Sequence, residues 1–397
     1  MSIDLTIING RVIDPTQNID AVDVVCAERD KMTPPPSECF ESRILVHADE
    51  DCIIVPGLID MHTHIFYRGS ELGFNADPGC LPQGVTTTVD AGSSGALTFG
   101  SFYSSVISTS AMRIYAELNV CSAGMPTLAY HENGNPKYFD LPRLLDIKAA
   151  HPDTIVGLKV RMDGGIWTDM SAKPLETSLK MADALKLPLI CHLNNPPMDA
   201  GDIAELLRPG DIFTHTYSPH GSTILDSSGK IKDKVRKARE RGVLFDAANS
   251  GPNSSFAIIA PAFEQGFFPD IISTDLVDIN IYNTGVFGLP YILTYMWAFG
   301  GMELTDIIKS ATQTPAKALN LKGLGSLAPG SFADIAVFKI VEKKITVKDR
   351  WNNPLIVEKW LVPQLTALAG RVCWRDMLFR RDSDNGRPEM VTLKTAV

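Results

Sequence analysis

The stretch that decides the fold is Leu58–His64, LIDMHTH, a short apolar run that ends in two histidines spaced H-x-H. Seven more short apolar runs follow, and stretches with helical spacing of apolar residues, such as 171–186 and 230–241, lie between them. The eight runs are Leu58–His64, Val85–Ala91, Arg113–Val120, Thr154–Arg161, Leu187–Leu193, Asp211–Thr216, Val243–Ala248 and Asp270–Leu276. This alternation predicts an α/β fold, a parallel sheet closed into a (β/α)₈ TIM barrel.

Strand-like segments also flank the barrel on both sides. They are 4–13, 43–55, 325–331, 333–338 and 368–374. Prolines in Lys31–Ser37 predict a loop there, because proline cannot donate to a sheet ladder. A last barrel helix is predicted at Leu304–Leu319. We therefore expect residues 57–322 to form the metal-binding barrel, and residues 1–56 and 323–397 to join as a small β-sandwich domain.

Composition limits the class of protein. The chain has 397 residues, of which 45% are hydrophobic and 21% charged, and a net charge of −9. An acidic chain with no lysine- or arginine-rich run disfavours nucleic acid and anionic membranes as partners. No apolar run approaches the ~20 residues of a membrane helix, and the start has no signal-peptide layout. Seven widely spaced cysteines fit reduced thiols, so we expect a cytoplasmic protein. With nucleic acid and membranes disfavoured, we expect a small-molecule substrate.

Polar side chains collect at the ends of five predicted strands. They are His62, His64, Lys159, His192, His215 and Asp275. Active sites of such barrels lie where the carboxyl ends of the strands meet, and imidazole and carboxylate groups are ligands for zinc, manganese, iron or cobalt. Each residue alone has an ordinary structural interpretation, such as a packed histidine or a helix-capping aspartate. Their joint placement, which uses four of the eight histidines, favours a metal site.

Lys159 is the unusual member of this set, because an ammonium group is not a metal ligand and is costly to bury without a partner. Its neutral amine can react with carbon dioxide to give a carbamate, an anionic ligand with two oxygens. We therefore expect N6-carboxylation of Lys159. The carbamate would bridge two metals that share a water or hydroxide. An ion pair between Lys159 and an acid is the plainer alternative.

The motif VPGLIDMHTH (Val55–His64) resembles the opening motif of the amidohydrolase superfamily. That resemblance implies two divalent metals, zinc or else manganese, held by the six residues named above, with the carboxylated lysine on strand four. Within the superfamily, the chain is similar to the amidohydrolase/deacetylase, dihydroorotase-like group. Three stretches carry this likeness: GVTTTVDAGSSGALTF (Gly84–Phe99), GLKVRM (Gly157–Met162) and PDIISTDL (Pro269–Leu276).

The chain departs from that group in two loops. Asn194 and Asn195 stand where a Gly-Glu pair is expected after strand five, and Asn249 follows strand seven where a Gly-His pair is expected. The departures lie outside the metal ligands and indicate a changed substrate. We predict substrate contacts at Arg161, Asn194, His220 and Asn249. Arg161 could clamp a carboxylate with its two-pronged guanidinium, or pair with a rim acid such as Asp163.

The predicted activity is hydrolysis of an amide or ester, an acyl or acetyl group on a small carboxylate-bearing molecule, by a metal-bridging hydroxide. Asp275 is assigned as general base and then general acid. Ring opening of a cyclic amide, as in dihydroorotases and hydantoinases, is the alternative, since both use one metal site. A single-metal deaminase is disfavoured by Lys159, and a metal-free scaffold by the complete ligand set. The likeness to oligomeric relatives leaves a homo-oligomer as an expectation.

Overall fold

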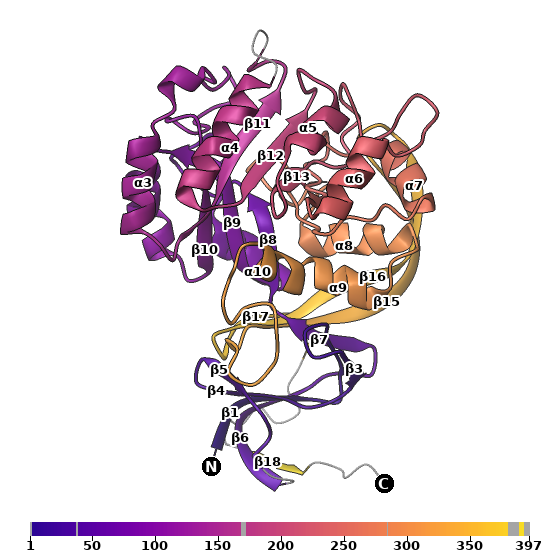
Figure 1. Ribbon diagram of the computed structural model, residues 1–397. Helices are drawn as coiled ribbons and strands as arrows, with labels where there is room; N and C mark the ends of the chain where they lie inside the picture. The colour runs from indigo at the N-terminus through magenta and orange to yellow at the C-terminus, as the bar shows by residue number, and fades with distance from the viewer. Residues whose placement is uncertain (1, 37–38, 168–171, 284, 380–388, 393–397) are drawn as a thin grey trace.

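The computed structural model describes the whole chain except residues 1, 37–38, 168–171, 284, 380–388 and 393–397. The chain forms two lobes (Figure 1). The larger lobe is built on a curled, seven-stranded parallel sheet, and the smaller lobe holds sheets of five and six strands. The first and last described strands, β1 (Ser2–Ile8) and β18 (Glu389–Thr392), both lie in the smaller lobe (Figure 1). The α/β class and the parallel sheet are as predicted.

The strands of the parallel sheet follow one another in chain order. They are β8 (Leu58–Thr63), β9 (Val85–Gly95), β10 (Arg113–Asn119), β11 (Ile155–Asp163), β12 (Leu189–Asn194), β13 (Ile212–Thr214) and β14 (Leu244–Asp246). The first seven predicted runs are therefore confirmed as strands. The eighth, 270–276, is not a regular strand. It still bonds to both edges of the sheet, because Ile271 N donates to Phe245 O (3.2 Å) and Asp275 N donates to His62 O (2.8 Å).

Helices alternate with these strands and cover the outside of the sheet (Figure 1). They are α1 (Ala76–Cys80), α2 (Phe99–Ser105), α3 (Leu141–Ala150), α4 (Lys173–Leu185), α5 (Ala200–Leu206), α6 (Asp233–Arg241), α7 (Phe256–Glu264), α8 (Leu289–Ala298), α9 (Leu304–Ser310) and α10 (Gln313–Ala318). Short 3₁₀ turns lie at Leu81–Gln83, Ile107–Thr109 and Pro136–Tyr138.

Two of the predicted helices are confirmed near their expected bounds, as α4 and α6, although Ser171 lies outside the described residues. The single helix predicted at Leu304–Leu319 is wrong, because it is two helices, α9 and α10. Pro315 has no N–H to donate to the carbonyl of Ala311, so the first helix cannot continue through it. Within the described part of the chain, no helix is both long enough and apolar enough to cross a membrane.

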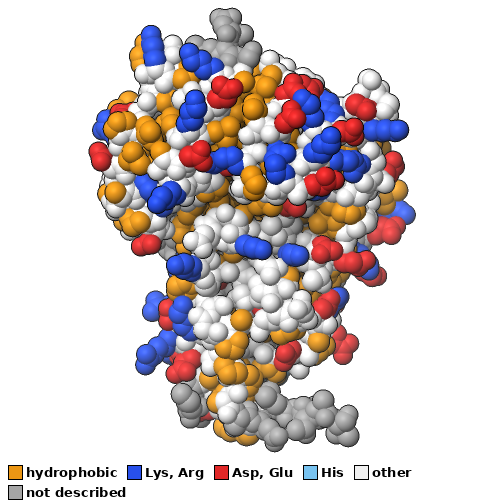
Figure 2. Space-filling view, viewed as in Figure 1, with side chains coloured by type: hydrophobic (Ala, Val, Ile, Leu, Met, Phe, Trp, Pro, Cys, Tyr) orange, Lys and Arg blue, Asp and Glu red, His pale blue; other side chains and the backbone are white. Residues whose placement is uncertain are grey.

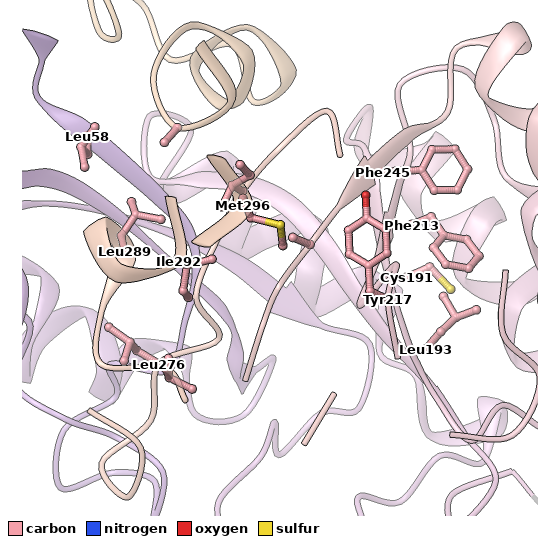
Figure 3. Packing of buried hydrophobic residues seen from close by; sticks show 14 of the residues in the cluster. Leu58, Cys191, Leu193, Phe213, Tyr217, Phe245, Leu276, Leu289, Ile292 and Met296 are labelled. Carbon is pink, nitrogen blue, oxygen red and sulfur yellow. The ribbon is translucent and has the colours of Figure 1, made fainter. Parts of the chain in front are cut away.

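Apolar layers lie on both sides of the parallel sheet. Between sheet and helices, residues such as Cys191, Phe213 and Phe245 pack together (Figure 3). A second cluster takes one residue from each of several strand segments, namely Ile59, Val89, Ile190, Ile212 and Ile271. Ile190 lies two residues before His192 on the same face of β12, because side chains alternate along a strand. The second cluster therefore forms an apolar layer beneath the polar strand ends.

The smaller lobe mixes strands from both ends of the chain in each of its sheets. The five-stranded sheet has the order β18 (Glu389–Thr392), β6 (Cys39–His47), β1 (Ser2–Ile8), β4 (Val25–Glu28), β5 (Lys31–Thr33). The six-stranded sheet has the order β17 (Arg371–Arg375), β16 (Pro354–Leu368), β15 (Ile335–Lys348), β7 (Cys52–Pro56), β2 (Arg11–Asp14), β3 (Ile19–Val22).

Several predicted segments of this lobe need correction. Segment 4–13 is two strands in different sheets, because a turn at Asn9, with a left-handed φ of 70°, redirects the chain. Segment 43–55 divides in the same way into β6 and β7. The predicted loop at Lys31–Ser37 begins with strand β5, and segment 325–331 contains turns rather than a strand.

The hairpin of β15 and β16 is much longer than the predicted strand at 333–338. Figure 1 shows it leaving the smaller lobe and running up the flank of the larger lobe beside α8. There Leu361 N donates to Thr294 Oγ1 (3.0 Å). The proposed division at residue 322 stays a prediction. On the face drawn in Figure 2, cations and anions are interspersed over the larger lobe.

Candidate metal centre

The six side chains predicted as metal ligands come together at the carboxyl ends of the strands. His62 lies near the end of β8 and His64 directly follows that strand, while Lys159 lies on β11 and His192 on β12. His215 directly follows β13, and Asp275 lies on the segment that bonds to β8 and β14. All six are buried, with exposed fractions of 6% or less. The structure thus gathers residues that are up to 213 positions apart, from 62 to 275, in one cluster.

Asp275 lies at the centre of this cluster. Its Oδ1 is 3.2 Å from His64 Nε2 and 3.5 Å from His62 Nε2, and its Oδ2 is 3.8 Å from His215 Nε2. Ligand atoms of His62, His215 and Asp275 all lie within 4.8 Å of one another. Burial alone would raise the pKa of Asp275, but the neighbouring histidines outweigh it and hold the pKa well below its usual range. The carboxylate therefore faces ring nitrogens of three histidines.

His192 and Lys159 extend the cluster on either side. His192 Nδ1 is 2.8 Å from His215 Nε2, and the buried His192 Nε2 has no hydrogen-bond partner among the described residues. Lys159 Nζ is 3.1 Å from His62 Nε2 and 3.9 Å from a carboxylate oxygen of Glu117. Burial lowers the pKa of Lys159, although Glu117 acts in the opposite direction. Imidazole nitrogens and a carboxylate held this close together form a set of ligand atoms that fits divalent cations.

Outer hydrogen bonds orient the imidazoles. Thr214 Oγ1 gives its proton to Asp246 Oδ2 (2.7 Å), so it accepts from His62 Nδ1 (3.1 Å). Ala248 O can only accept, so His215 Nδ1 donates to it (2.7 Å). Both rings therefore direct an unprotonated Nε2 toward the cluster. Burial agrees with this, because it lowers the pKa of His62 well below its usual value and that of His215 to about 3. Such carbonyl and carboxylate partners are typical of metal-ligating histidines.

A hydroxyl group also orients the ring of His64. Its Nδ1 lies 2.9 Å from Ser93 Oγ, and Ser93 N donates to Asp90 Oδ1 (2.7 Å). Asp90 also accepts from Ile65 N (3.0 Å), the residue after His64. The end of β9 therefore fixes both the ring and the backbone of His64.

The backbone is also unusual at two predicted ligands. His215 has φ 62° and Asp275 has φ 53°, in the left-handed region that residues with a Cβ seldom adopt. Such a conformation costs about 1–3 kcal/mol and persists where surrounding bonds enforce it. The bonds here are Ser218 N to His215 O (3.0 Å) and Asp275 N to His62 O (2.8 Å). The backbone conformation at these two residues is therefore unfavourable by itself, and the surrounding hydrogen bonds maintain it so that both side chains point into the cluster.

Three further buried acids, Asp60, Glu117 and Asp246, surround the cluster. Asp60 accepts from Thr274 N (3.1 Å) and Thr274 Oγ1 (2.6 Å), and so holds the residue before Asp275. Asp246 bonds Thr214 and Ser273 (both 2.7 Å). Burial raises the pKa of Asp60 to about 7 and that of Glu117 to about 8. In the sequence, the feature that could have identified each of these residues is an acidic residue within an apolar strand segment.

The four predicted substrate contacts differ in their surroundings. Arg161 donates to Glu132 (2.7 Å) and more weakly to Asp163 (3.5 Å), which leaves its buried Nε without a partner among the described residues. Asn194 has a buried, unpartnered Oδ1 at the end of β12. Asn249 is engaged at both ends, donating to Gly285 O and accepting from Tyr295. His220 is half-buried and contacts Pro252 O.

Comparison with known proteins identifies enzymes that are similar to this chain. A sequence profile of the amidohydrolase family matches residues 142–372. A deacetylase of Brucella anthropi is 32% identical over 298 residues, which is 75% of this chain and 73% of that protein. Among solved structures, a dihydroorotase is 26% identical with a TM-score of 0.82, covering 93% of this chain and 97% of the other. An adenine deaminase shares the fold, at 24% identity and a TM-score of 0.86, covering 94% and 100%.

Proposed function

This chain belongs to the amidohydrolase family and is a metal-dependent hydrolase of amide or acyl bonds, and we propose that its buried cluster holds two divalent metals, zinc or manganese, to remove an acyl group from a small, carboxylate-bearing substrate. The observation that carries the proposal is the position of Asp275. Its carboxylate lies 3.2–3.8 Å from three imidazole nitrogens, which come from the ends of two strands, β8 and β13. Imidazole nitrogens around one buried carboxylate, at the carboxyl ends of parallel strands, suit a hydrolytic metal centre.

In this proposal, His62, His64, His192, His215 and Asp275 hold the metals, and Lys159 completes the set as a carbamate. Its neutral amine adds to carbon dioxide, which forms one N–C bond and releases one proton. Bound there, divalent metals would make a water molecule more acidic and polarise the substrate carbonyl. The eighth segment and the β-sheets of the smaller lobe would complete the (β/α)₈ barrel and β-sandwich expected from sequence.

Asp275 acts on protons in the proposed reaction. As an anion beside the reacting position, it takes a proton from the attacking water and later gives it to the leaving amine or alkoxide. Asp60 and Asp246 hold Thr274 and Ser273, the two residues before it, so the carboxylate keeps one orientation. Arg161 binds the substrate carboxylate, and would have to exchange its contact with Glu132 for it.

The first experiment is metal analysis by plasma mass spectrometry on protein purified without chelator. Two metals per chain, with hydrolysis of N-acyl or O-acyl carboxylic acids, would support the proposal. One metal would indicate an unmodified Lys159. No metal, with no activity gained from zinc, manganese and bicarbonate, would refute it and favour a non-catalytic scaffold.

A second candidate is ring opening of a cyclic amide, which the match to a dihydroorotase structure favours. The same protein would be assayed with cyclic imides, dihydropyrimidines and acylated carboxylic acids in parallel. Turnover confined to the cyclic compounds would select the second candidate over the first.

A further inference from the structure

The turn of the β15–β16 hairpin, residues 349–353, belongs in sequence to the C-terminal strands but lies against the loops beside the metal cluster. The hairpin reaches the larger lobe along its flank (Figure 1). Asp349 Oδ2 accepts from Phe256 N (2.7 Å) and from Ser255 Oγ (3.2 Å), at the start of α7. Trp351 Nε1 donates to Ser254 O (3.2 Å). The tip of the hairpin thus bonds three consecutive residues of the loop that follows β14.

Trp351 also contacts a predicted substrate residue. Its ring meets His220 edge to face, with centroids 5.3 Å apart and planes at 72°. His220 Nε2 lies 3.1 Å from Pro252 O, and a carbonyl can only accept, so Nε2 carries a proton. In the neutral ring, Nδ1 is then an acceptor. Among the described residues, the hydrogen bond of the His220 ring is made by Nε2, so Nδ1 remains available to accept one.

A hydrogen-bonded turn connects His220 to His215 of the metal cluster. It lies on the turn directly after His215, where Ser218 N donates to His215 O (3.0 Å) and His220 N donates to Ser218 Oγ (3.3 Å). The next residue, Gly221, packs on Asn195, since a Cβ there would lie 2.9 Å from Asn195 Cα. Loops after three successive strands therefore meet at His220, and the hairpin tip closes the outer side of this group.

We propose that Trp351 is a positioning residue, which fixes the ring of His220 so that its Nδ1 accepts a hydrogen bond from an N–H or O–H group of the substrate. The proposal rests on the proposed function, since it assigns His220 to the wall of the same site. The tryptophan blocks one side of the imidazole and its indole N–H anchors the neighbouring loop at Ser254. Without it, His220 would keep its backbone place and lose its fixed orientation.

The test is a double-mutant cycle on the metal-loaded enzyme with Trp351→Ala, His220→Ala and the double variant. Each single variant should raise KM roughly tenfold, as expected for one hydrogen bond and its geometry, with a much smaller change in kcat. The double variant should resemble His220→Ala alone. Trp351→Phe keeps a ring against His220 and should recover most of the loss. Ile356→Ala, an exposed position on the same hairpin, is the control and should behave as wild type.

Additive losses in the cycle, or a fall in kcat at unchanged KM, would overturn the proposal. Hydrogen–deuterium exchange gives a readout that does not need activity: Trp351→Ala should speed exchange in peptides covering 215–222 and 249–256, and Ile356→Ala should not. Unchanged exchange in Trp351→Ala would also overturn it. If the wild-type enzyme hydrolysed no acylated or cyclic substrate, the proposed function would fail, while the exchange experiment would still decide whether the tip holds these loops.

Discussion

Replacing Asp275 with asparagine tests the centre of the proposed site. The substitution keeps the shape of the side chain, and so keeps the packing around a carboxylate that is 5% exposed. It removes the negative charge that faces His62, His64 and His215 at 3.5, 3.2 and 3.8 Å. Five other proposed ligands remain. We therefore expect most of the metal to stay bound while the group that moves the proton is lost.

The expected loss follows from the role assigned to Asp275. Positioned general acid–base groups contribute about 10²- to 10⁴-fold to rate, which corresponds to about 3–5 kcal/mol of activation free energy. Initial rates on an N-acyl carboxylic acid should fall in that range, with metal content per chain measured on the same preparation. Asp278→Asn is the matched control. Asp278 lies three residues on and is exposed, and among the described residues its hydrogen bond is the one from its backbone N–H to Leu72 O.

Three results would count against this reasoning. Turnover near that of wild type would show that Asp275 moves no proton. Loss of activity together with loss of all metal would show that Asp275 serves only as a ligand. A fall in rate shared by Asp278→Asn would point to damage to the whole segment and would count against the assignment as well.

The remaining predictions concern three other positions. Lys159→Ala should lose metal and activity, with partial recovery on adding short carboxylic acids, and full metal occupancy in this variant would rule out a carbamate ligand. Arg161→Lys should raise KM for anionic substrates only, because lysine cannot form the two-pronged contact, and equal effects on neutral substrates would reject the clamp. Asp334→Ala should lower the free energy of unfolding by about 3 kcal/mol, because it removes acceptors for Arg113 Nε (2.9 Å), Arg113 Nη2 (3.2 Å) and Ala369 N (2.8 Å). An unchanged urea midpoint would contradict that prediction.

The sequence predicted the sheet and the cluster because both depend on strong local patterns. Buried parallel strands are continuous apolar runs, and a polar residue at the end of such a run stands out, as at His62, Lys159 and His192. The eighth run gave the right position for Asp275 although the segment makes too few ladder bonds to be a strand. Its hydrogen bonds to both neighbours place the side chain as a strand would.

What the sequence did not predict depends on contacts between distant segments. The long hairpin was missed because much of it is exposed on both faces, as in the stretch from Glu342 to Thr346, which leaves no alternating pattern. The split of segment 4–13 turns on one left-handed residue, Asn9. The sequence predicted no role for Glu117 and Asp246, because their environment depends on burial and on a buried partner, which spacing in the sequence does not reveal.

The hairpin also changes how the two lobes relate to the chemistry. A barrel that ended at residue 322 would contain every proposed metal ligand, yet Phe256 N at the start of α7 would lose its acceptor, Asp349. An unpaired buried donor costs about 1–3 kcal/mol, and it would arise in the loop that adjoins His215 and His220. The C-terminal strands therefore do more than cover the N-terminal ones. They supply bonds to the loop before α7. If His220 lines the site as we propose, the chemistry of the larger lobe depends on residues that follow it in the chain.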